Sequence, residues 1–315
     1  MVDAKTASAR FETAQQDFFE EVGLTATTRF IDLETPPIRT HVIESGPQDN
    51  REPLVFVHGT AAFGAFLAPL MAQFPGTRTI AFDRPGYGLS APFEYNADNL
   101  HRTNVEVIKG VLDALDLDQV HLVGHSMGGH ASIRFALEHP ERVQQITTLG
   151  AMPGFPGTHL PLPFRLMTVP LLNRLIQRLQ PSGEEGALEI AEILGERAAF
   201  EAHPSFVRAN AANDADPKAA KAGQSEIIAI STIRGWRPSF PIRSEELREL
   251  RHPTLLIWGA DDPIGKPADV RDSVRSITQA RFETLGSGHL PYLAQPAKCA
   301  ELIREANSMG SANAA

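Results

Sequence analysis

The chain has 315 residues, of which 42% are hydrophobic and 21% are charged, and these proportions are ordinary for a globular protein. Its 29 basic and 38 acidic residues give a net charge of −9, which argues against nucleic acid or a polyanion as a partner. The single cysteine, Cys299, excludes an intramolecular disulfide and a cysteine-based metal site. The sequence shows neither a signal-peptide pattern nor a run long enough to span a membrane, so we expect a cytoplasmic protein.

The first part of the chain predicts a helix followed by a β-hairpin. Residues 8–22 place their large apolar side chains on one face of an amphipathic helix. We expect residues 1–25 to form a helical extension that packs against the body of the protein. Two runs rich in β-branched residues, 28–33 and 39–43, are separated by a Pro-Pro pair and predict the hairpin.

The next part of the chain alternates short apolar runs with helical patterns. A run such as Leu54–Val57 is typical of a strand buried on both faces of a parallel sheet. The alternation predicts an α/β fold with a mostly parallel sheet. The expected strands are 54–57, 79–82, 120–123 and 145–149, and the expected helices are 63–74, 99–115 and 131–138.

From about Met152 this alternation stops, and no strand pattern returns until Thr254. Structureless loops of that length are uncommon, so we predict a helical insertion. Its helical patches cover residues 171–179, 186–199 and 225–233, and after it we expect strands at 254–258 and 281–285 and a helix at 296–308.

The run from Gly124 to Gly128 (Gly-His-Ser-Met-Gly) matches the G-x-S-x-G pattern of a nucleophile elbow. It stands between a predicted strand and a predicted helix, which is the context that this motif requires. Glycines stand two positions before and two positions after the serine, because the turn brings the strand and helix backbones too close for side chains there. Ser126 would lie at a helix N-terminus, where the N–H of Met127 can stabilise an oxyanion. The alternative is a turn serine without chemistry.

Polar side chains also follow two later strands of the predicted sheet. Asp261 and Asp262 follow one strand, and His289 follows the last strand in a loop with glycine on its N-terminal side. Because the carboxyl ends of parallel strands meet at one edge of a sheet, we expect these groups to converge on Ser126. A nucleophilic serine needs a base, and a neutral imidazole needs a carboxylate that holds its tautomer.

Other histidines compete with His289 for the role of base. His58 is expected to satisfy backbone groups of its own loop, and His121 lies within a strand. His125 is adjacent to the serine, but neighbouring side chains in such a turn point in different directions. His289 is preferred because a glycine-rich loop lets its ring pivot between two proton positions, and His41 remains a further rival.

Taken together, these residues resemble the α/β-hydrolase superfamily. The resemblance rests on five motifs in the family's order, namely His58–Thr60, Asp83–Ser90, Gly124–Gly129, Gly259–Asp262 and Gly288–His289. It implies an eight-stranded, mostly parallel sheet flanked by helices, with a helical cap inserted after the sixth strand. The core would comprise residues 26–151 and 241–315, and the cap would comprise residues 152–240.

The same resemblance implies roles for individual residues. It favours Asp262 over Asp261 as the triad acid, and it makes the N–H of Thr60 a second oxyanion donor beside that of Met127. Haloalkane dehalogenases and most epoxide hydrolases of this fold carry aspartate in place of Ser126, so we set them aside. Enzymes of the hormone-sensitive-lipase type are set aside because the three-glycine run after the His-Gly pair is missing.

These features predict a serine hydrolase that cleaves an apolar carboxylic ester through an acyl-enzyme. Ser126, His289 and Asp262 would form the triad, and neither a cofactor nor a metal is expected. The expected partner is a small-molecule substrate. Phe63 and Leu290 are candidate pocket walls.

Other readings of the cap and of the triad stay open. Phe155 and Trp236 are candidates for the roof of the pocket, unless they form the cap's own core. Arginines beside Trp236 could bind a substrate carboxylate or be solvated surface charge, and they are Arg234, Arg237 and Arg243. The same triad supports C–C bond or lactone hydrolysis and perhydrolysis. A hydrolase-fold ligand receptor is the non-enzyme alternative.

Overall fold

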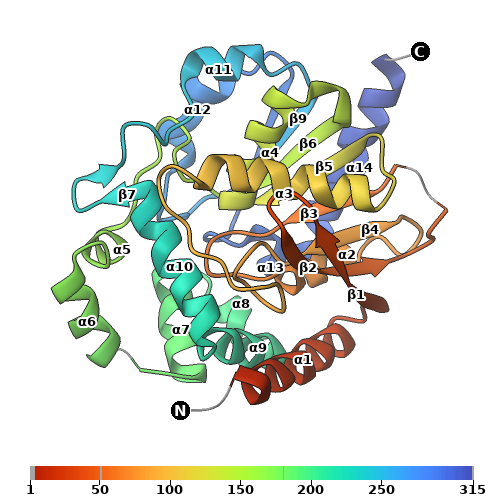
Figure 1. Cartoon of the computed structure of the whole chain (residues 1–315). Helices are drawn as coiled ribbons and strands as arrows, with labels where there is room; N and C mark the ends of the chain where they lie inside the picture. Colours follow the sequence, from red (N-terminus) through yellow and green to blue (C-terminus); the bar gives the residue numbers. More distant parts are fainter. Residues whose placement is uncertain (1–3, 50–51, 180, 314–315) are drawn as a thin grey trace.

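The computed structural model describes residues 4–49, 52–179 and 181–313, and its centre is an eight-stranded sheet (Figure 1). In sheet order the strands are β1 (Ala26–Leu33), β2 (Ile38–Ser45), β4 (Thr79–Phe82), β3 (Leu54–Val57), β5 (Val120–His125), β6 (Val143–Leu149), β9 (Thr254–Gly259) and β10 (Ala280–Leu285). β2 is antiparallel to both of its neighbours, and all pairs from β4 to β10 are parallel. The predicted α/β fold with a mostly parallel sheet is confirmed.

Helices cover both faces of this sheet. One hydrophobic cluster joins it to α3 (Leu100–Ala114), α4 (Met127–Glu138), α11 (Ser244–Glu249) and α12 (Pro267–Arg275). The other cluster joins it to η1 (Gly64–Leu67), α2 (Ala68–Met71), α13 (Pro291–Ala294) and α14 (Pro296–Asn313). Within β3, Val55 and Val57 belong to the first cluster and Phe56 to the second, as the two-residue period of a strand requires.

The sequence predicted the core strands better than the helices around them. The predicted bounds of β3 and β4 agree with the structure, but the single helix predicted over residues 63–74 is wrong, because the chain makes only η1 and one turn of α2. The Gly64 N–H is held by an Asp83 oxygen at 2.6 Å, so this segment follows the neighbouring turn. α12 escaped prediction because charged residues dominate it and its buried apolar face includes only Val270 and Val274.

After β6, the sixth strand of the sheet, the chain enters the predicted helical insertion. Residues 152–240 are called the cap segment below. It contains α5 (Leu162–Leu166), α6 (Pro170–Leu179), α7 (Glu184–Ile193), α8 (Arg197–Glu201), α9 (Pro204–Asp214), α10 (Pro217–Ile230) and a hairpin of β7 (Ser231–Thr232) and β8 (Gly235–Trp236). The hairpin was not predicted, because two residues per strand give no periodic pattern.

The N-terminal helix α1 (Ala4–Glu21) lies beside α9 at the lower edge of the molecule in Figure 1. The Phe18 and Phe206 rings pack with centroids 5.1 Å apart, and a Glu21 oxygen accepts the Ser205 N–H at 2.8 Å. Nearer the N-terminus of the helix, Phe11 packs edge-on against Phe63, with the ring centroids 4.8 Å apart. α1 therefore ties the cap segment to the loop that follows β3. Within the ranges described, none of the helices combines the length and the apolar sequence needed to cross a bilayer.

Candidate active site

Ser126 occupies a sharp turn between β5 and α4. Its backbone has φ 53° and ψ −117°, a conformation that residues other than glycine rarely adopt. A Cβ at Gly128 would lie 1.9 Å from the Val57 carbonyl oxygen, and one at Gly124 would lie 2.4 Å from the Gly128 oxygen. Both glycines are therefore required by close backbone approach. The strained conformation is that of a nucleophile elbow.

Asp262 and His289 form a buried pair at the ends of β9 and β10. His289 Nδ1 lies 2.8 Å from Asp262 Oδ2, which also accepts the Ala151 N–H at 2.8 Å. The other carboxylate oxygen, Oδ1, accepts the Ile264 N–H at 2.9 Å. Because these two N–H groups fix the carboxylate, it can hold the imidazole in one orientation and one tautomer. Asp261, the rival acid, is 83% exposed.

The end of β6 brings this pair close to the serine. The Ser126 N–H donates to Leu149 at 3.1 Å, and a Cβ on the next residue, Gly150, would lie 2.3 Å from the His289 carbonyl oxygen. The His125 and His289 rings have centroids 4.9 Å apart. Ser126, Asp262 and His289 are 5%, 0% and 4% exposed, so the candidate triad is almost closed to solvent.

The loop after β3 passes directly over the serine. A Cβ at Gly59 would lie 3.1 Å from the Ser126 Cβ. The next residue is Thr60, the predicted second oxyanion donor. Met127 is the first residue of α4, where a backbone N–H has no acceptor within the helix. Thr60 and Met127 therefore stay the candidate oxyanion donors.

The rival histidines have other partners. His58 donates from Nδ1 to Gly59 and accepts the Arg84 N–H at Nε2, both at 2.8 Å, as expected for a loop-satisfying residue. Burial, reinforced by the Arg84 charge, lowers the pKa of His58 to about 3. Burial also lowers the pKa of His121 to about 3 and that of His125 well below its usual value. His41 is paired with Asp83 at 2.8 Å.

A buried ion pair links the cap segment to the loop over the serine. Arg84 in the turn after β4 pairs with Glu226 of α10, and the two side chains are 2% and 0% exposed. The same guanidinium donates to the Gly59 carbonyl at 3.2 Å and to Asn104 at 2.9 Å, and Tyr87 donates to Glu226 at 2.6 Å. This network connects α10 to the predicted oxyanion loop. Sequence reasoning missed Glu226, since a lone glutamate in a helix carries no signal.

We expect Glu226→Ala to destabilise the fold by about 3 kcal/mol or more, because it leaves the Arg84 charge buried and unpaired. Urea unfolding followed by circular dichroism measures this difference. Glu245→Ala is the matched control, since Glu245 is 69% exposed, and it should change stability by less than about 0.5 kcal/mol. Equal effects of the two substitutions would contradict a structural role for the buried pair.

A second cap carboxylate, Glu196, holds the loop that carries His289. The His289 N–H donates to the Leu194 carbonyl at 3.0 Å, and the Leu290 N–H donates to Glu196 Oε1 at 2.7 Å. The Gly288 N–H also bonds to the Glu196 carboxylate. Three successive N–H groups around His289 therefore end on the turn between α7 and α8. The predicted single helix over 186–199 hid this turn, although Gly195 with φ +72° marks it.

We expect Glu196→Gln to remove a pH dependence of stability. Burial raises the pKa of Glu196 to about 7, although the N–H groups of Leu290 and Gly288 and the nearby His289 oppose the rise. A raised pKa means that ionisation is harder in the folded state, so wild-type stability falls as pH increases from about 4.5 to 7. Over this pH range the free energy of unfolding of the wild type should fall by roughly 2 kcal/mol more than that of Glu196→Gln.

Urea unfolding at pH 5 and pH 8 measures this difference, with Glu192→Gln as the exposed control near the end of α7. A parallel pH dependence in Glu196→Gln and wild type would show that Glu196 does not titrate as described.

The two candidate pocket walls, Phe63 and Leu290, are both buried. Phe63 is fully buried and packs against Phe11 and Phe66, and Leu290 directly follows His289 and is 1% exposed. Both belong to the hydrophobic cluster that includes residues of α7 and α9. They stay candidates for the wall of the substrate cavity.

The two candidate roof residues lie elsewhere. Phe155 packs against Trp258 at 6.1 Å, within the cluster that includes α12. The Trp236 Nε1 donates to the Thr158 carbonyl at 2.9 Å, and its ring packs on Phe240 at 5.7 Å. Phe155 thus packs in the cluster of the sheet and not in a core of the cap's own, and Trp236 contacts other residues of the cap segment. We do not propose either side chain as a substrate contact.

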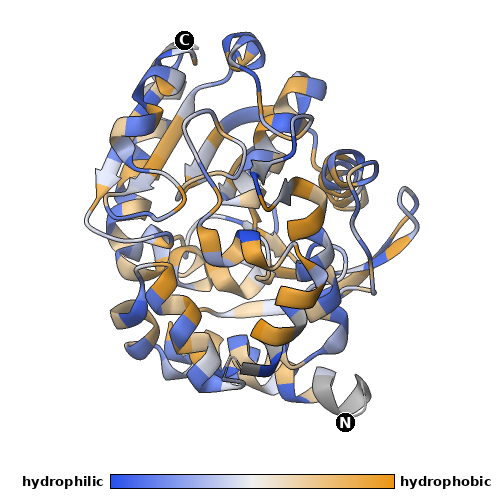
Figure 2. Cartoon of the chain, turned by 90° about the vertical axis from the view of Figure 1, so that its left-hand side faces the viewer, coloured by the Kyte–Doolittle hydropathy of each residue, from blue (hydrophilic) through white to orange (hydrophobic). Residues whose placement is uncertain are grey.

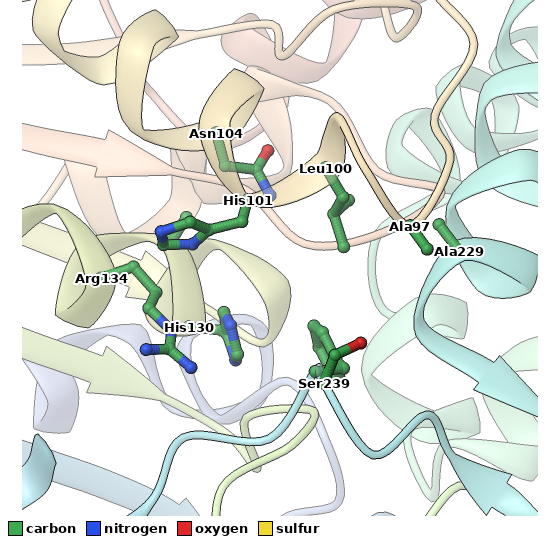
Figure 3. A pocket seen from close by; sticks show the side chains of 10 residues that line it. Ala97, Leu100, His101, Asn104, His130, Arg134, Ala229 and Ser239 are labelled. Atoms are coloured by element: carbon green, nitrogen blue, oxygen red, sulfur yellow. The ribbon is translucent and has the colours of Figure 1, made fainter.

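Figure 3 shows a surface pocket that is separate from the triad. It lies where α3 and α4 meet α10, and none of Ser126, Asp262 and His289 lines it. His130 there stacks on Phe240 at 4.5 Å, and burial lowers its pKa to about 3. Arg134 forms an ion pair with Glu246 at 2.6 Å. We therefore do not associate this pocket with the candidate chemistry.

The fold and the elbow define a class of protein. The family model for the alpha/beta hydrolase fold matches residues 52–296, and the chain belongs to this family of hydrolases. A curated relative from Cupriavidus pinatubonensis, 2-hydroxy-6-oxononadienedioate/2-hydroxy-6-oxononatrienedioate hydrolase, is 31% identical over 245 residues, covering 75% of this chain and 79% of that protein. Its counterpart from Paraburkholderia phymatum is 29% identical over 285 residues, covering 84% and 90%.

Solved structures share the fold. Carboxylesterase CesB from Bacillus subtilis superposes with a TM-score of 0.73 at 22% identity, over 95% of this chain and 97% of that one. The 2-hydroxy-6-oxo-6-phenylhexa-2,4-dienoate hydrolase of Rhodococcus sp. strain RHA1 superposes with a TM-score of 0.75 at 18% identity, over 90% and 99%. At these identities the likeness establishes the fold alone.

Proposed function

We propose that this protein is a serine hydrolase that cleaves an uncharged carboxylic ester with an apolar acyl or alcohol part. The observation that carries the proposal is the strained Ser126 elbow placed beside the buried Asp262–His289 pair. Such strain is costly, and it persists where a sharp turn must present the hydroxyl of a nucleophile.

In this mechanism Ser126 attacks the ester carbonyl while His289 takes its proton. The N–H groups of Thr60 and Met127 hold the oxyanion, and each contributes roughly 3 kcal/mol to lowering the barrier. His289 then returns the proton to the leaving alcohol, and Asp262 stabilises the imidazolium. In the second half of the reaction His289 takes a proton from a water molecule, which attacks the acyl-enzyme. His289 then returns the proton to Ser126 as the carboxylic acid leaves. The cap segment, residues 152–240, excludes bulk water from these steps.

Charge pairing around the site favours an uncharged substrate. The buried cation beside the oxyanion loop, Arg84, is already paired with Glu226. Arg237 donates to the Ile228 carbonyl, and Arg243 pairs with Glu246. Arginines that are engaged in this way are poor partners for a substrate carboxylate.

The second candidate is hydrolysis of a C–C bond in a dienedioate. It is favoured by the 31% identity to a curated hydrolase of 2-hydroxy-6-oxononadienedioate. That substrate is a dianion, whereas Arg84, the buried cation beside the oxyanion loop, is already paired with Glu226. Lactone hydrolysis and perhydrolysis would use the same triad.

A substrate comparison separates the two candidates. We would measure kcat/KM for p-nitrophenyl esters of rising acyl length and for 2-hydroxy-6-oxononadienedioate, using the full chain. The proposal predicts an ester optimum with kcat/KM at least a hundredfold above that of the dienedioate. The opposite ratio would assign the C–C hydrolase function and overturn the ester proposal.

A further inference from the structure

One face of the cap segment exposes leucines. A helix that packs on a protein core in water normally buries such side chains. Six large hydrophobic side chains are exposed in the described part of the chain, and only Phe30 lies outside the cap segment. The other five, 39% to 76% exposed, are Leu162, Leu171, Leu172, Leu175 and Ile233.

In the helix α6 the apolar side faces solvent and a polar residue is buried, which is the reverse of the usual arrangement. Leu171, Leu172 and Leu175 are spaced so that they share one side of the helix, and this side faces solvent. Asn173 is 1% exposed, so an amide is buried while leucines are not. In a helix that packs on a core in water, the apolar side faces inward. The exposed side of α6 is therefore suited to an apolar environment.

The chain stretches that carry these apolar residues contain no acidic residue. Residues 143–183 contain three arginines and neither Asp nor Glu, and residues 227–244 also contain three arginines and no acidic residue. The whole chain nevertheless carries a net charge of −9. Arg178 and Arg234 are exposed. The two stretches that carry the exposed apolar residues therefore contain basic residues without acidic ones.

The two acid-free stretches form one continuous surface. Arg165 of α5 donates from Nε to the Ile233 carbonyl at 2.8 Å, which joins α5 to the β7–β8 hairpin. Figure 1 shows α5, α6 and β7 together at the left of the molecule, and Figure 2 looks at that side, where the helices facing the viewer carry much hydrophobic colour. We call this surface, with the five exposed apolar residues and Arg165, Arg178 and Arg234, the α6 face.

We propose that the α6 face docks on a lipid surface with anionic headgroups. Leucines that enter the acyl region while arginines meet headgroup phosphates are the pattern of an interfacial helix. A second copy of this chain fits less well, because a two-fold interface would bring the same arginines together. The proposal does not depend on the chemistry assigned to Ser126.

Vesicle co-sedimentation tests this docking. Full-length protein is mixed with vesicles of phosphatidylcholine alone or with 30% phosphatidylglycerol, roughly the anionic content that gives a strong surface potential. We expect at least tenfold more bound protein on the anionic vesicles, and binding that weakens as salt increases, since screening acts on exposed charges.

Variants assign the binding to this face. Leu171→Glu with Leu175→Glu, and separately Arg178→Glu, should each reduce binding at least fivefold, while Phe30→Glu, at the exposed hydrophobic residue outside the face, should not. Melting temperatures confirm that the variants fold. Absence of binding to both kinds of vesicle would overturn the proposal. A dimer seen by light scattering that the leucine variant dissociates would also overturn it, because the face would then bind a second copy.

Discussion

Ser126→Ala is expected to reduce kcat for ester hydrolysis by about 10⁴-fold or more while the fold is kept. Removing the nucleophile of a serine triad costs about as much as removing the whole triad, and what remains comes from the oxyanion hole and substrate binding. The substitution removes one oxygen from a side chain that is 5% exposed, and the Ser126 hydroxyl makes no capping hydrogen bond to α4. The melting temperature should therefore stay within a few degrees of wild type.

A nearby serine supplies the control for this variant. Ser287 lies two residues before His289, is 9% exposed, and its hydroxyl has no hydrogen-bond partner among the described residues. Ser287→Ala should retain kcat within about threefold, because the hydroxyl it removes makes no hydrogen bond to the triad or to the loop that carries His289. If Ser126→Ala kept wild-type turnover, a different residue would have to be the nucleophile.

Asp262→Asn is expected to lower kcat by about 10³- to 10⁴-fold with little change in KM. The amide keeps the shape of the carboxylate but cannot stabilise an imidazolium, and its NH₂ group favours the wrong tautomer of His289. The carboxylate is 0% exposed and accepts from His289, Ala151 and Ile264, so some loss of stability is expected as well.

The adjacent acid gives a matched control. Asp261 is 83% exposed, and its contact with Lys266 is a surface pair at 3.6 Å. Asp261→Asn should leave kcat and stability close to wild type. A large loss of activity in Asp261→Asn together with an active Asp262→Asn would reverse the choice between the two acids.

The sequence was most informative where local chemistry is unambiguous. Leu54–Val57 and Thr79–Phe82 are apolar runs bounded by turn residues, and their predicted bounds agree with the structure. The fold prediction followed from such strands and is confirmed. Ser126, Asp262 and His289 each stand just after a strand of a parallel sheet, so topology alone brings them to one edge.

What the sequence could not provide are contacts between distant segments. Glu196 and Glu226 lie in unremarkable helical stretches, and only the folded cap brings them to the His289 loop and to Arg84. The reversed polarity of α6 was also hidden, because periodicity shows that a helix has an apolar side but not which way that side faces.

The measurement that tests the central claim most directly is labelling with a fluorophosphonate, followed by peptide mapping. This reagent reacts with a serine that is activated by a base, so it reports the nucleophile without knowledge of the substrate. We predict stoichiometric labelling of the peptide that contains Ser126, none in Ser126→Ala, and labelling at least a hundredfold slower in Asp262→Asn. Labelling of another residue, or no labelling of a folded protein even with short, small phosphonates, would contradict the account.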